Sequence, residues 1–218
     1  MIGYLQKTFR SRLPKRKLRL YLCDCWRHLL GKGNGDLPSN LLVAERYADE
    51  QLSLDDMNVI RESVRLASIY WRVQAHPEQI LAEVVLDRHK ELWDSALRVT
   101  ALVIQLRLAD AFPDGFAPNV ADAWRIRRDE ERPYLAEMVR DIFGNPFRPV
   151  EFDPRWRTSD VLGLARAIYD DRAFDRLPIL ADALMDAGCA DEQVLAHCRE
   201  PGQHVRGCWV VDLVLGKE

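Results

Sequence analysis

The stretch DRLPILADALMDAG, residues 175–188, decides the fold class of this chain. Its apolar side chains recur every three or four residues, which places them along one face of an α-helix. Pro178 falls in the first turn, where a missing backbone N–H costs little, and Gly188 stands where helices commonly end. We therefore expect a short amphipathic helix with a buried apolar face, formed by Leu177, Leu180, Leu184 and Ala187.

The same period continues on both sides of this stretch. A cap at Thr158 or Ser159 predicts a preceding helix, and Asp191 predicts a following helix that Pro201–Gly202 ends. The last apolar segment, residues 205–216, is rich in valine and fits either a helix or a strand. Because no other stretch reads convincingly as a strand that could pair with it, we expect a helix here too.

Helical spacing also dominates the rest of the chain. Apolar residues keep this spacing over 57–75 and 78–112, and further helices are expected over 119–132 and, with Pro133 in its first turn, over 133–143. We therefore predict an all-α fold, either stacked helical hairpins or an irregular helical bundle.

The domain organisation follows from a break near residues 113–120, which hold two prolines and a glycine. The break predicts an N-terminal helical part with a basic arm at 1–115 and a C-terminal helical part at 119–218. One continuous domain is the alternative.

The composition is that of a globular protein. Of the 218 residues, 48% are hydrophobic and 30% are charged, so a core and a solvated surface are both available. The most apolar stretch, residues 99–106, is far shorter than the roughly 20 residues that a membrane-spanning helix needs. We expect a cytoplasmic protein with reduced cysteines and no membrane contact, because no signal peptide is evident.

The N-terminus is strongly basic. Residues 1–28 carry eight Lys and Arg residues against one Asp, a net charge of +7, so the remainder carries −10. This arm either docks on the acidic body of the protein or binds the phosphates of a nucleic acid. The residues that would contact nucleic acid are Arg10, Arg12, Lys15, Arg16, Lys17 and Arg19.

A possible zinc site lies in HCREPGQHVRGCW, residues 197–209. Zinc takes four Cys or His ligands at close spacings. However, His197 and Cys198 are adjacent, so on a helix they point about 100° apart and could share one ion only if the helix had ended. We therefore favour a helix end, a turn and a new helix, with the cysteines in the core. A structural zinc site stays the alternative, with ligands drawn from Cys25, Cys189, Cys198, His204 and Cys208.

The loop GNPFRPVEFDPRWRT, residues 144–158, is the most distinctive stretch. Aromatic and Arg side chains alternate in it, a composition typical of interaction hot spots and also of loops pinned to their own core. The residues expected to bind a partner are Phe147, Arg148, Arg155 and Trp156 in the loop and Trp209 in the last apolar segment.

Three segments resemble a large family of uncharacterised bacterial proteins. They are VRDIFGNPFRPV at 139–150, AIYDDRAFDRLPILADALMDAGC at 167–189 and LAHCREPGQHVRGCWVVDLVLGKE at 195–218. Residues 16–30 and 43–53 resemble the family more weakly. The resemblance implies a mostly helical module with no established activity, and it favours an interaction module over an enzyme.

No catalytic or cofactor-binding motif stands out, so we expect neither an enzyme nor a cofactor. The leading hypothesis is a non-catalytic protein-interaction or adaptor module that binds another protein. A nucleic-acid-associated accessory protein and a small zinc-binding helical domain are the alternatives.

Overall fold

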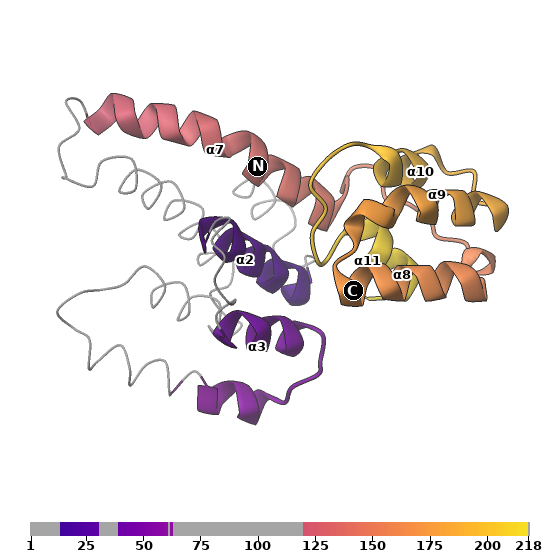
Figure 1. The fold of residues 1–218 in the computed structure, drawn as a ribbon, viewed down its shortest axis with the longest axis horizontal. Coiled ribbons are helices and arrows are strands. Elements are labelled where there is room, and N and C mark those ends of the chain that lie inside the picture. The colour runs from indigo at the N-terminus through magenta and orange to yellow at the C-terminus, as the bar shows by residue number, and fades with distance from the viewer. Residues whose placement is uncertain (1–13, 31–38, 61, 63–119, 218) are drawn as a thin grey trace. The chain divides into compact units, whose positions relative to one another are not determined.

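A computed structural model describes residues 14–30, 39–60, 62 and 120–217 (Figure 1). Every regular element in these ranges is a helix, so the all-α prediction is confirmed. The chain divides into two compact units, residues 1–136 and 137–218. Most of the predicted break near 113–120, and most of the helices predicted over 57–75 and 78–112, fall on residues outside the described ranges.

The described part of the first unit is built around helix α2 (Lys15–Leu30), which packs against α3 (Ser39–Ala48). Residues 18–26 of α2 are buried without interruption, so this helix is covered on all sides rather than along one stripe. A further helical stretch covers residues 54–60.

Helix α7 (Val120–Phe143) is one continuous helix, so the prediction of two helices separated at Pro133 is wrong. Proline removes one backbone N–H and frees the carbonyl of the residue four positions earlier, here Asp129. Both Pro133 and Asp129 are exposed, so the freed carbonyl can bond water and the helix continues. The helix ends at Gly144, whose φ of 63° is left-handed and whose N–H donates to the Arg140 carbonyl at 2.9 Å, as the glycine predicted.

The second unit contains residues 137–143 of α7 and four further α-helices. These are α8 (Ser159–Asp171), α9 (Leu177–Asp186), α10 (Glu192–Arg199) and α11 (Trp209–Leu215), with short 3-10 turns η1 (Pro154–Trp156) and η2 (Phe174–Arg176). Helix α8 packs against α9 and α11, and α10 packs against α9 and α11. The stretch that begins at Asp175 therefore forms a 3-10 turn first and the α-helix only from Leu177.

Local signals explain where these helices begin. The Thr158 hydroxyl accepts a hydrogen bond from the Val161 N–H at 3.3 Å and caps α8. The Asp191 carboxylate accepts from Gln193 and Val194 at 2.9 and 3.1 Å and caps α10. The helix predicted for the valine-rich C-terminal segment is present as α11. None of the described helices is long and apolar enough to cross a membrane.

The core of the second unit is formed by one aliphatic cluster from all four of its own helices. Its most central members are Val161, Ala165, Ile168, Leu177, Leu180, Leu184, Val194, Val210, Val211 and Val214, each with no exposed surface. The residues that the helical period assigned to the buried face of 175–188 include three of these: Leu177, Leu180 and Leu184. The fourth, Ala187, is partly buried against the same cluster.

Candidate functional site

The loop 144–158 begins in close contact with Trp209. A Cβ placed on Gly144 would lie 3.1 Å from Cγ of the Trp209 indole, so only glycine fits without a shift. Trp209 itself packs against the core of the second unit and is half-buried. Trp209 therefore supports the start of the loop, and its role as a partner-binding residue stays a prediction.

The end of the loop is held by Arg157. Its guanidinium donates hydrogen bonds to the backbone carbonyls of Val214 at 3.0 Å and Leu213 at 2.8 Å, in the last turn of α11. It also lies over the Phe152 ring, 5.0 Å from the centroid. Phe152 meets the Trp156 ring edge-on at 5.2 Å, and both rings pack against the core. Trp156 therefore pins the loop from within.

Two of the predicted contact residues, Phe147 and Arg148, are exposed. Phe147 is 63% exposed, while its N–H donates to the Asn145 side chain at 3.0 Å. The Arg148 N–H donates to the Asn145 carbonyl at 3.1 Å, which closes a turn. Arg155 is exposed as well, but its guanidinium pairs with the Asp153 carboxylate at 2.6 Å. The loop thus presents one aromatic ring and one Arg side chain on a backbone fixed at both ends.

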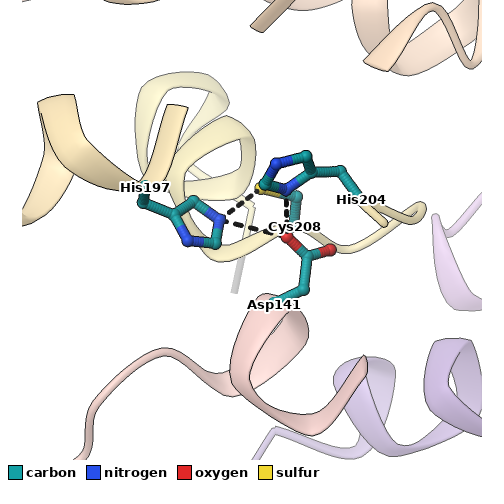
Figure 2. A group of neighbouring side chains, drawn as sticks. All are labelled: Asp141, His197, His204 and Cys208. Atoms are coloured by element: carbon teal, nitrogen blue, oxygen red, sulfur yellow. Dashed lines mark hydrogen bonds and ion pairs between the residues drawn. The ribbon is translucent and has the colours of Figure 1, made fainter. Parts of the chain in front are cut away.

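A second group of side chains takes three of its four members from residues 197–209, the motif that suggested zinc. Asp141, His197, His204 and Cys208 point toward one another (Figure 2), and their potential ligand atoms all lie within 4.8 Å of one another. Asp141 comes from the last turn of α7 and His197 from α10. His204 lies in the segment between α10 and α11, and Cys208 is the residue that precedes α11.

The contacts within this cluster converge on two atoms. Nε2 of His197 lies 3.0 Å from Oδ1 of Asp141 and 3.3 Å from Sγ of Cys208. Nδ1 of His204 lies 2.6 Å from the same Oδ1. The second carboxylate oxygen, Oδ2, accepts a hydrogen bond from the Val205 N–H at 2.8 Å. One carboxylate oxygen is thus shared by two imidazoles, and one imidazole nitrogen is shared by a carboxylate and a thiol.

All four side chains are largely buried, and their surroundings shift the pKa values of Asp141, His204 and Cys208. Burial alone would raise the pKa of Asp141, but the hydrogen bonds from His197 and His204 hold it below its usual value. Burial would lower the pKa of His204, but the hydrogen bond to Asp141 and its charge raise it. Burial, with the nearby Asp141 charge, raises the pKa of Cys208 well above that of a free thiol. Without a cation, the structure therefore favours a protonated thiol beside an ionised carboxylate.

Two of the five residues named as zinc ligands from the sequence, His204 and Cys208, lie in this cluster, and three do not. Cys25 is fully buried in α2, Cys189 follows α9, and Cys198 turns from α10 into the core. All five cysteines of the chain are free thiols. Sequence reasoning missed Asp141 and His197 as members of the cluster. His197 was considered only as a joint ligand with its neighbour Cys198. In the structure the His197 side chain lies in the cluster, whereas the Cys198 side chain lies in the core.

The basic arm is engaged within the first unit where the structure describes it. Arg16 pairs with Asp49 at 3.1 Å, and the buried Arg19 guanidinium lies 4.9 Å from the centre of the Tyr47 ring. Lys15 is exposed and Lys17 is half-buried. Arg10 and Arg12 lie outside the described residues. The docking interpretation accounts for Arg16 and Arg19, and nucleic-acid binding stays a prediction for the others.

No family model, no curated protein sequence and no solved structure matches this chain. The resemblance of residues 135–218 to a family of bacterial proteins therefore stays a prediction.

Proposed function

We propose that this chain is a cytoplasmic, non-catalytic protein-interaction module that contacts its partner through the loop 144–158. The observation that carries the proposal is that Phe147 is 63% exposed, beside the exposed Arg148. Aromatic and Arg side chains are enriched among the residues that dominate binding energy at protein interfaces. The five free thiols are typical of a protein kept in a reducing compartment.

The support beneath these two residues favours a binding surface over a mobile tip. Gly144 is packed on Trp209 at one end of the loop, and Arg157 is bonded to the end of α11 at the other. Asn145 bonds the backbone at Phe147 and Arg148 between these ends. A surface that is ordered before binding loses less conformational entropy when it binds, so more of the contact energy remains as affinity.

The test is affinity capture from lysate of the source organism with Phe147→Ala/Arg148→Ala as the variant. Ile179→Ala is the matched control, because Ile179 is an apolar residue of the same unit that is 57% exposed on α9. We expect the double variant to lose the partners that the unmodified chain captures, and the control to keep them. Both should keep the far-ultraviolet circular dichroism of the unmodified chain. Equal capture by the double variant and the unmodified chain would remove the loop as the contact surface.

A further inference from the structure

We propose that Asp141, His197, His204 and Cys208 bind one Zn²⁺ and that this ion is structural. The proposal goes beyond the interaction loop and does not depend on it, because none of the four residues lies in residues 144–158.

The first argument is the set of donor atoms. A carboxylate oxygen, two imidazole nitrogens and one sulfur are all atoms that zinc takes as ligands. With bonds of about 2.0 to 2.3 Å, a tetrahedral zinc ion holds its ligand atoms about 3.3 to 3.8 Å from one another. Here the ligand atoms lie as close as 2.6 Å, and no two of them are more than 4.8 Å apart. This range includes the separations that a tetrahedral zinc ion needs.

The second argument is that hydrogen bonds satisfy the cluster poorly. Nε2 of His197 contacts both Oδ1 of Asp141 and Sγ of Cys208. If this nitrogen carries a proton, it donates to the carboxylate, and the thiol sulfur is left as a weak second acceptor. If it carries a lone pair, it can accept from the thiol but faces the carboxylate oxygen with like partial charge. A cation among the four atoms removes this conflict, because every ligand then presents a lone pair to it.

The third argument separates this cluster from a catalytic one. A nucleophilic cysteine is activated by a base on one imidazole nitrogen, while a carboxylate orients the ring through the other nitrogen. In this protein the thiol and the carboxylate meet the same nitrogen of His197, so the ring cannot relay a proton between them in that manner. The arrangement is that of ligands around a common point.

The fourth argument concerns the surroundings of the site. The side chains of His197 and His204 are 15% and 9% exposed, Asp141 is 3% exposed, and Cys208 is fully buried. Four protein ligands complete a tetrahedral zinc site and leave no open position for a substrate, which is typical of a structural ion. Oδ2 of Asp141 is fixed by the Val205 N–H, a contact of the kind that orients metal-binding carboxylates.

An ion here would stabilise a part of the chain that has little regular structure. The segment between α10 and α11 has neither helix nor strand, apart from turns. Arg206 attaches this segment to α8 by lying over the Tyr169 ring, 4.5 Å from its centroid. The proposed zinc adds links from the same segment to α7 and α10, so two helices and the segment that leads into α11 meet at one point.

The test is the zinc content of the full chain, expressed in zinc-supplemented medium and purified without a polyhistidine tag or chelator. We expect about one zinc per chain, the stoichiometry of a four-ligand site. Cys208→Ser and His204→Ala should each lower the content at least several-fold. Cys189→Ser is the matched control, because Cys189 is a buried thiol of the same unit outside the cluster, and it should keep the zinc.

Should the ligand variants fail to fold, a titration of the unmodified, metal-free chain with Co²⁺ provides a second test. Coordination by Cys208 predicts a thiolate-to-cobalt charge-transfer band that saturates at about one Co²⁺ per chain and disappears when Zn²⁺ is added. Absence of zinc from the purified chain together with absence of that band would overturn the proposal. Unchanged zinc content in a folded Cys208→Ser variant would overturn it as well.

Discussion

Replacement of Cys208 by alanine tests whether this residue is a metal ligand or only a packed core thiol, because the two roles predict different losses in the free energy of unfolding. Cys208 is fully buried, so truncation of its side chain removes one methyl-sized group from the core and costs about 1 kcal/mol. This cost is the same with or without zinc. If Cys208 is also a ligand, the variant loses the stabilisation that the ion provides. A ligand at a thousand times its dissociation constant stabilises the folded state by about 4 kcal/mol.

The assay is urea unfolding of the full chain followed by circular dichroism, in buffers that contain either excess zinc or a chelator. We expect Cys208→Ala to cost about 5 kcal/mol with zinc and about 1 kcal/mol with chelator. With about 1 to 3 kcal/mol per molar urea, the difference moves the midpoint by more than about 1 M. Cys198→Ala, at a buried thiol outside the cluster, should cost the same in both buffers. An equal cost for Cys208→Ala in the two buffers would refute the reasoning.

Three further predictions test the loop and the core. Gly144→Ala forces a left-handed backbone on alanine and brings its Cβ to 3.1 Å from the Trp209 ring, so thermal melting should show a loss of stability of at least about 1 to 2 kcal/mol. Gly163→Ala, in α8 with open space around it, should instead gain up to about 1 kcal/mol of stability. Arg157→Ala removes two hydrogen bonds to the end of α11 and should lower the stability by about 1 to 2 kcal/mol in the same measurement. Arg155→Ala, at an exposed ion pair, should leave the melting temperature unchanged, and equal effects of the two variants would contradict the anchoring role of Arg157. Burial raises the pKa of Cys198 to about 12, so this thiol should not react with Ellman's reagent at pH 8 until the chain is unfolded, and fast labelling of Cys198 in the native chain would show that the core is open.

Features that depend on local sequence could be predicted from it. The cap at Thr158, the cap at Asp191 and the left-handed Gly144 each act over three or four residues, and all three are present. The apolar period of 175–188 likewise identified a helix whose leucines lie in the core. These signals are local because helix hydrogen bonds and capping bonds are local.

Features that depend on which side of a helix or loop faces solvent could not be predicted from the local sequence. Proline was expected to separate two helices at residue 133, but its exposed position lets one helix continue. The loop 144–158 has no period, so the sequence could not say that Trp156 turns inward while Phe147 turns outward. Both outcomes depend on packing between segments.

The cluster was the hardest feature to predict because its members are distant in sequence. Asp141 lies 56 positions before His197, in a helix with many other charged residues, so nothing local distinguishes it as a ligand. His197 was set aside because its neighbour Cys198 points elsewhere. The structure brings only one of the two to the cluster, which is all that a four-ligand site requires.

The most direct measurement is zinc K-edge X-ray absorption on the zinc-loaded full chain, because it reports the atoms bound to the ion. The account predicts one sulfur at about 2.3 Å and three nitrogen or oxygen atoms at about 2.0 to 2.2 Å. A shell of two or more sulfur atoms, or a shell with none, would contradict it.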